Sequence, residues 1–118
     1  MPYRKKILIL QNDDFMRELL GNLLHKDGLY ILNGSSIEKG LQRAEDHNVS
    51  MVILSSDCED FDGKSSINYI NKELETPEIF LINEASQKVS YHPSEDQMLA
   101  KDLSVQKIVQ IVNKKTLG

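Results

Sequence analysis

The chain has 118 residues, of which 40% are hydrophobic and 27% are charged, and its formal net charge is −4. This composition is typical of one globular domain and excludes a disordered tail, a collagen-like repeat and a coiled coil. Uninterrupted apolar runs such as residues 7–10 stop at four residues, whereas a membrane-spanning helix needs roughly 20. The acidic balance argues against nucleic acid as a partner. We therefore expect a single cytoplasmic domain over residues 1–118, with no membrane and no nucleic-acid partner.

The first strand is predicted at residues 7–10, an apolar run with the composition of a strand buried on both faces. A helix is predicted after it, because apolar residues recur there at helical spacing. Asp13 or Asp14 can cap this helix at its start, and Asp27-Gly28 can end it. Its predicted buried stripe is Phe15, Met16, Leu19, Leu20, Leu23 and Leu24.

The second strand is predicted at residues 29–32, and a second helix follows it. Ser35 stands three residues before Glu38, the spacing of a capping box. The predicted buried stripe of this helix is Ile37, Leu41 and Ala44.

The third strand, residues 51–54, has the clearest apolar pattern and leads into residues 57–63, which we call the acidic loop. A third helix is predicted after this loop and should end near Thr76-Pro77, because a residue before proline disfavours helix. A fourth strand is predicted at residues 79–82. The buried stripe of the third helix is predicted as Ile67, Ile70 and Leu74.

The last third of the chain has a weaker pattern. Residues 84–95 are mostly polar and contain Pro93, so we expect a loop there, with a fourth helix that is shortened or irregular. Met98-Leu99-Ala100 is predicted as a short fifth strand, and a final amphipathic helix begins after its cap, Ser104. The predicted stripe of that helix is Val105, Ile108, Val109, Ile111 and Val112.

Strands that alternate with helices predict an α/β fold. The expected architecture is a flavodoxin-like, doubly wound parallel sheet of five strands with helices on both faces. Ligands of such sheets bind at the carboxyl ends of the strands. Residues 11–14, 55–63, 82–85 and 100–103 are therefore the candidates for a functional site.

The order of these elements, with Lys6 leading into the first strand and Asp62-Gly63 closing the acidic loop, resembles that of a response-regulator receiver domain. The resemblance extends over almost the whole chain, although residues 84–96 are shorter than is usual in that family. It implies a signalling role. In the family, two acidic residues after the first strand hold magnesium, and an aspartate ending the third strand accepts phosphate. A hydroxyl ends the fourth strand, and a lysine follows the fifth.

Most of these groups are missing at the corresponding positions of this chain. Gln11 and Asn12 stand where the acidic pair is expected, with Asp13 as the nearby acidic residue. Ser55 stands at the phosphoacceptor position, and a serine hydroxyl is a poor nucleophile without a base. Ile82 stands at the hydroxyl position. Two amides supply no charge to a divalent cation, so the resemblance implies a degenerate member, a pseudo-receiver without metal.

Lys101 corresponds to the family's lysine and is the one group retained. With Ser55 neutral, Asp13 and Asp57 are its expected ion-pair partners. Asp57 is also the alternative phosphoacceptor, because a third strand two residues longer would bring it to the strand end. The interpretation we favour is that the carboxylates of the acidic loop form a solvated charged surface; a calcium site lacks the required spacing.

The sequence therefore predicts a module that acts through protein–protein contact and has no catalytic residue and no cofactor. We expect contact with its partner through residues 84–112, and a homodimer is left open. The alternatives are a receiver that is phosphorylated on Asp57 with magnesium, and a flavodoxin-like protein that binds a small ligand. His25, His47 and His92 lack metal-ligand spacing and are predicted at the surface. Carboxylates beside Cys58 should disfavour its thiolate.

Overall fold

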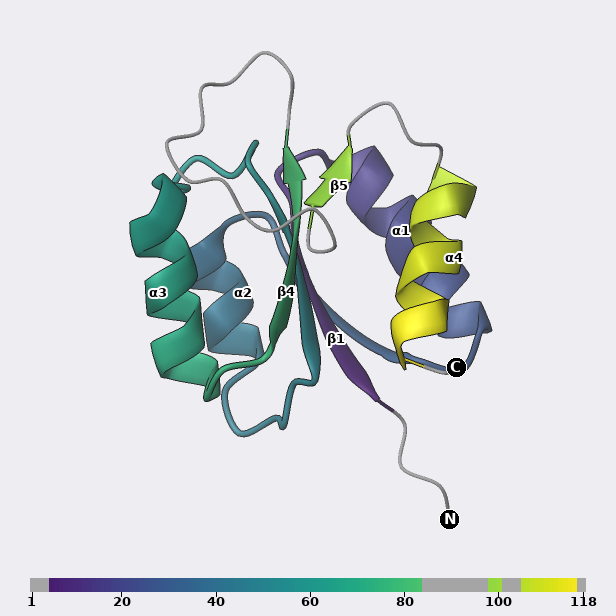
Figure 1. The fold of residues 1–118 in the computed structure, drawn as a ribbon, viewed down its shortest axis with the longest axis horizontal. Coiled ribbons are helices and arrows are strands. Elements are labelled where there is room, and N and C mark those ends of the chain that lie inside the picture. The colour runs from purple at the N-terminus through teal and green to yellow at the C-terminus, as the bar shows by residue number, and fades with distance from the viewer. Residues whose placement is uncertain (1–4, 84–97, 101–104, 117–118) are drawn as a thin grey trace.

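The computed structural model describes residues 5–83, 98–100 and 105–116. These residues form one parallel β-sheet with helices on both of its faces (Figure 1). The strands, in the sheet order β2-β1-β3-β4-β5, are β2 (Tyr30–Gly34), β1 (Lys6–Leu10), β3 (Met51–Ser55), β4 (Glu78–Asn83) and β5 (Met98–Ala100). The helices are α1 (Asp14–Lys26), α2 (Ile37–Arg43), α3 (Gly63–Leu74) and α4 (Val105–Thr116). The predicted α/β fold with a parallel sheet is confirmed.

The sheet separates two hydrophobic cores. Ile7 and Ile9 of β1 pack with buried residues of α1 and α4, whereas Leu8 and Leu10 pack with buried residues of α2 and α3. Successive side chains of a strand point to opposite faces, so a strand that is apolar at every position has a core on each side. Figure 1 shows the two helix pairs on opposite sides of the sheet.

The ends of α1 lie where the sequence predicts them. Asp13 is the N-cap, and its Oδ1 accepts a hydrogen bond from the Met16 N–H at 3.0 Å. The helix ends before Asp27, and Gly28 follows with a φ of 93°, a left-handed conformation that glycine adopts without steric cost. Leu20 and Leu24 of the predicted stripe are buried.

The prediction that Phe15 is buried is wrong, because its side chain is 72% exposed. Phe15 lies in the first turn of α1, after the carboxyl end of β1. The sheet no longer provides a surface beneath that turn, so the helical spacing of Phe15 does not bring it into the core.

The capping box predicted between Ser35 and Glu38 is also wrong. The N-cap of α2 is Ser36, whose Oγ accepts from the Lys39 N–H at 3.2 Å. The Glu38 N–H donates instead to the Asp60 carboxylate at 3.0 Å. A carboxylate from a distant loop therefore helps to cap α2, which local spacing does not reveal.

Helix α2 approaches the sheet unusually closely through two glycines. A Cβ added to Gly34 would lie 2.4 Å from the Gly40 nitrogen, and one added to Gly40 would lie 1.9 Å from Cδ2 of Leu10. The carbonyl of Gly34 accepts from the Gln11 N–H at 3.1 Å. The end of β2 that lies against α2 is thus also bonded to the chain that leaves β1.

Strand β5 and helix α4 form at their predicted places, with Ile108, Val109 and Val112 buried. Strand β2 runs to Gly34, beyond the predicted residues 29–32. The predicted irregular fourth helix and the cap Ser104 lie outside the described residues. Within the described ranges, no helix is both long enough and apolar enough to cross a membrane.

Candidate functional site

Three of the sequence-predicted site residues meet at the carboxyl edge of the sheet. Leu10 of β1 pairs with Leu54 of β3, which places Gln11 next to Ser55. Ser55 in turn pairs with Ile82 of β4. Parallel strands thus bring Gln11, Ser55 and Ile82 together at the strand ends, as the sequence predicts for a flavodoxin-like sheet. We call these three residues the row.

These three side chains are buried and carry no charge. Gln11 is 4% exposed, Ser55 0% and Ile82 5%. The Ser55 Oγ accepts a long hydrogen bond, 3.4 Å, from the Asp57 N–H. The amide oxygen of Gln11 is buried and has no hydrogen-bond partner in the described part of the chain. The row therefore has no carboxylate, and its member on β4, Ile82, has no hydroxyl.

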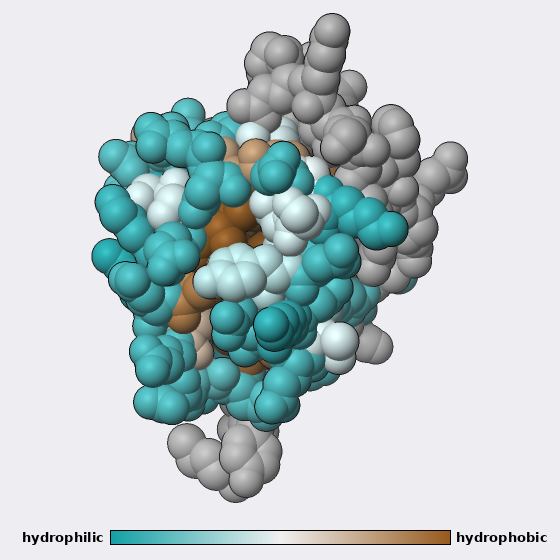
Figure 2. All heavy atoms as spheres, turned by 90° about the vertical axis from the view of Figure 1, so that its left-hand side faces the viewer, coloured by the Kyte–Doolittle hydropathy of each residue, from teal (hydrophilic) through white to brown (hydrophobic). Residues whose placement is uncertain are grey.

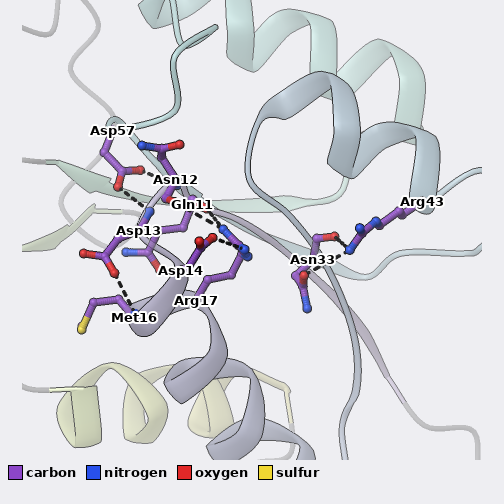
Figure 3. Close-up of polar contacts among 9 residues, drawn as sticks. All are labelled: Gln11, Asn12, Asp13, Asp14, Met16, Arg17, Asn33, Arg43 and Asp57. Carbon is purple, nitrogen blue, oxygen red and sulfur yellow. Dashed lines mark hydrogen bonds and ion pairs between the residues drawn. The ribbon is translucent and has the colours of Figure 1, made fainter.

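Asp57 joins the acidic loop to the loop between β1 and α1. Its Oδ1 accepts from the Asn12 N–H at 2.9 Å, and its Oδ2 accepts from the Asp13 N–H at 3.2 Å (Figure 3). Strand β3 ends at Ser55, so the longer strand that would place Asp57 at its end does not form. Both oxygens of the Asp57 carboxylate are thus engaged in fixing the backbone.

Replacing Asp57 with asparagine is expected to lower the free energy of unfolding by about 1.5 kcal/mol, because one of two charge-assisted hydrogen bonds is lost. Urea denaturation at pH 7 measures the change. Glu59→Gln neutralises an exposed carboxylate in the same loop and is the matched control, with an expected change within about 0.5 kcal/mol. Equal stability of the two variants would contradict a structural role for Asp57.

Arg17 of α1 also contacts the loop between β1 and α1. Its guanidinium donates to the Gln11 carbonyl at 2.7 Å and forms an ion pair with Asp14 at 2.5 Å (Figure 3). The Asp13 carboxylate caps α1 at the same place. The Asp13 carboxylate therefore already accepts a backbone hydrogen bond, and Arg17 has a role that the sequence pattern does not predict.

The carboxylates of Glu59, Asp60 and Asp62 in the acidic loop are exposed, as expected, but two of them also make hydrogen bonds. Asp60 accepts from the N–H groups of Ile37 and Glu38, both at 3.0 Å, so it anchors the loop to the start of α2. Asp62 accepts from the Ser65 hydroxyl at 3.1 Å. Asp60 has this role because unpaired N–H groups at a helix start need acceptors.

No family model and no curated protein sequence matches the chain. Solved structures do match it. A CheY-like response regulator receiver domain protein from Methanospirillum hungatei JF-1 has a TM-score of 0.77 and 12% identity, with 97% of this chain and 94% of that chain covered. The chain has the receiver-domain fold. The receiver domain of the hybrid histidine kinase CckA has a TM-score of 0.74 and 21% identity, covering 96% and 99%. CheY from Borrelia burgdorferi, in a complex with CheX, BeF3 and Mg, has a TM-score of 0.71 and 16% identity, covering 94% and 88%.

The residues at the strand ends of this receiver fold do not suit magnesium. Magnesium is bound in proteins mainly by carboxylates, but Gln11 and Asn12 offer neutral amides. The carboxylates of Asp13 and Asp57 accept backbone N–H groups. Within the described ranges, no three His, Cys, Asp or Glu side chains are grouped so that they could hold a metal ion.

Cys58 is buried in the acidic loop of the receiver fold, close to the strand ends. Burial, and to a smaller extent the charges of Asp57 and Asp60, raise the pKa of its thiol to about 12. The expected direction is thus confirmed, although burial contributes more than the neighbouring carboxylates that the sequence suggested.

We expect Cys58 to resist thiol reagents in the native protein at pH 8, since little of it is thiolate. Because the folded pKa exceeds the unfolded one, the folded state binds the proton more tightly, and stability falls as the pH rises from 9 toward 12. Labelling with a chromogenic disulfide reagent, with and without urea, measures the reactivity. Cys58→Ala should remove this pH slope; rapid native labelling would contradict the burial.

Other predicted residues lie away from the row or outside the described ranges. His25 is exposed, and His47 is half-buried, with its ring stacked on that of Tyr30 at a centroid distance of 5.8 Å. His92 and Lys101 lie outside the described residues, so an ion pair of Lys101 with Asp13 or Asp57 stays a prediction.

Arg43 donates to the Asn33 carbonyl at 3.1 Å, at the edge of the sheet (Figure 3).

Proposed function

We propose that this chain is a pseudo-receiver, a signalling module of receiver fold that takes up no phosphoryl group at its strand ends. It acts by binding a protein partner, has no catalytic residue and needs no cofactor. Ser55 replaces the phosphoacceptor in this proposal, and Gln11 and Asn12 replace the acidic pair.

The observation that carries the proposal is the row of buried, uncharged side chains at Gln11, Ser55 and Ile82. A carboxylate attacks phosphorus when cations offset the repulsion between the two anions. This row offers a neutral amide, a hydroxyl and an alkyl group. In this proposal, Gln11 removes a ligand for the metal, Ser55 removes the nucleophile and Ile82 removes a ligand for the phosphate.

A receiver phosphorylated on Asp57 is the competing function. Asp57 has the required chemical group and lies beside the strand ends. Both of its oxygens accept N–H groups, however, so attack on phosphorus would first have to release the loop after β1. This cost is the reason that we rank phosphorylation of Asp57 second.

A flavodoxin-like small-ligand protein is the third candidate. It would need a deep pocket with convergent polar groups at the strand ends. The larger grooves described in this chain, each of about 500 Å³, lie between α2 and α3 and between α1 and α4. Neither is lined by Gln11, Ser55 or Ile82, so nothing in their position favours this function.

A protein with the same fold binds a protein partner, because the Borrelia burgdorferi CheY was solved in a complex with CheX. This example supports partner binding as the function that we propose. We keep residues 84–112 as the proposed contact region. Within it, the structure describes residues 98–100 and 105–112. A homodimer through the same region is the other form of contact that the proposal allows.

Incubation with a small phosphodonor and magnesium, followed by intact-mass measurement, tests the proposal. We expect no phosphoryl adduct, whereas a phosphorylatable receiver treated in parallel should acquire one. An adduct that disappears in Asp57→Asn would replace the pseudo-receiver proposal with the competing one.

A further inference from the structure

A groove of about 500 Å³ runs between α2 and α3, on the face away from α1 and α4. Leu41, Ala44 and Leu74 contribute its apolar lining. Figure 2 shows this face as a hollow with a hydrophobic floor and a hydrophilic rim. The groove is distinct from the row at the strand ends.

The rim of this groove is acidic. No lysine or arginine is among the described residues that line it, whereas five acidic residues are: Glu38, Glu45, Asp46, Glu73 and Glu75. The chain has 18 acidic and 14 basic residues, so the residues outside this lining are nearly balanced in charge. The groove therefore concentrates a negative potential over an apolar floor.

Tyr69 of α3 lies within that negative potential. Its side chain is 42% exposed, although it lines the groove. The charge of Glu38 on α2 raises the pKa of the Tyr69 hydroxyl, and burial and the charge of Glu73 raise it further. An exposed aromatic ring beside carboxylates is a favourable contact for a lysine or arginine side chain.

We propose that the groove between α2 and α3 binds a basic amphipathic segment of a protein partner. Apolar side chains of the segment lie on Leu41 and Leu74, and its lysine or arginine side chains contact Tyr69 and the carboxylates of Glu38 and Glu73. This inference rests on the proposed function in taking partner binding as the output of the module. It adds a second contact surface and the chemistry of its ligand.

The chemistry of the groove selects this occupant over others. Nucleic acid and anionic membrane surfaces are repelled by five carboxylates. A small cation would leave the apolar floor in water, whereas an amphipathic segment covers it and pairs with the rim. Electrostatic complementarity of this kind raises the association rate and selects the partner.

The test uses isotope-labelled protein and a short synthetic peptide with lysine and leucine at helical spacing. One control peptide has glutamate in place of lysine, and another has serine in place of leucine. We expect the lysine–leucine peptide to shift the amide signals of α2 and α3, with an affinity that falls as salt is added. Both control peptides should bind at least about tenfold more weakly. The first cannot pair with the acidic rim, and the second cannot cover the apolar floor.

A matched pair of double variants identifies the groove. Glu38→Gln with Glu73→Gln removes two rim charges and should weaken binding by about tenfold. Glu18→Gln with Glu59→Gln removes two exposed charges outside the groove and should leave the affinity unchanged. Tyr69→Ala should also weaken binding.

Several results would overturn the inference: no binding of the lysine–leucine peptide, signal shifts centred outside α2 and α3, or equal loss in both double variants. Self-association of the chain that shifts the same amides without peptide would make a second copy the occupant and would also overturn it. The phosphodonor experiment leaves the groove untouched, so failure of the proposed function and failure of this inference are observed separately.

Discussion

Ser55→Asp is expected to lower the free energy of unfolding by about 4 kcal/mol at pH 7, because it places an unpaired charge in a buried position. Ser55 is 0% exposed, and its backbone pairs in register with that of Ile82. Its described neighbours at the strand ends, Gln11 and Ile82, have no charge to offset that of the new carboxylate. If Ser55 stands at the phosphoacceptor position, as we propose, an aspartate there therefore costs stability in this chain.

Ser55→Asn is the matched control, since asparagine has the size of aspartate without its charge. The difference between the two variants in urea denaturation isolates the cost of charge. Burial raises the pKa of the introduced carboxyl above its unfolded value, so the extra penalty should shrink as the pH falls and the carboxyl is protonated. Equal stability of the two variants at pH 7 would mean that the site still accommodates a carboxylate.

Gly34→Ala should lower the free energy of unfolding by about 3 kcal/mol, because its methyl group would collide with backbone rather than with a flexible side chain. The added Cβ would lie 2.4 Å from the Gly40 nitrogen and 2.5 Å from the Gly40 Cα. Relief requires α2 to move away from the sheet, which loosens the packing of Ile37 and the anchoring of α2 by Asp60.

Gly21→Ala is the control for the same substitution. Gly21 lies within α1, and the nearest atom to its added Cβ is Ile31 Cγ2 at 3.5 Å, an ordinary contact. Alanine favours helix over glycine, so this variant should be equally stable or more stable by up to about 1 kcal/mol. Thermal unfolding of both variants measures the contrast; a similar loss at both positions would contradict the close approach at Gly34.

The strands and the row at their ends could be predicted from the sequence because both depend on local pattern. An apolar run such as residues 7–10 predicts a buried parallel strand, and the end of each run predicts which side chain reaches the carboxyl edge. Gln11 and Ser55 therefore lie side by side as the strand pattern predicts. Their roles stay proposals, because position does not show what a side chain does.

The contacts around the row could not be predicted because they join distant segments. Asp57 is 45 residues from Asn12, and Asp60 is 23 residues from Ile37. No periodicity distinguishes these two carboxylates from the others in the acidic loop. Helical spacing likewise gave no sign that Phe15 lies beyond the sheet. Which carboxylate accepts from an unpaired backbone N–H group at a helix start depends on how the distant segments pack in the folded protein.

The acidic loop thus has two structural roles in place of the catalytic one expected of a phosphorylatable receiver. Asp57 holds the loop after β1, and Asp60 holds the start of α2. A carboxylate that accepts backbone N–H groups stabilises one conformation of the loops that it joins. In the proposed pseudo-receiver, these contacts favour a constant surface over switching with phosphate.

Titration with beryllofluoride and magnesium, followed by the amide signals of labelled protein, tests the pseudo-receiver proposal most directly. We predict that the signals of residues 11–13 and 55–57 stay unchanged at saturating reagent. A stoichiometric, magnesium-dependent shift of these signals that is abolished by Asp57→Asn would contradict the proposal.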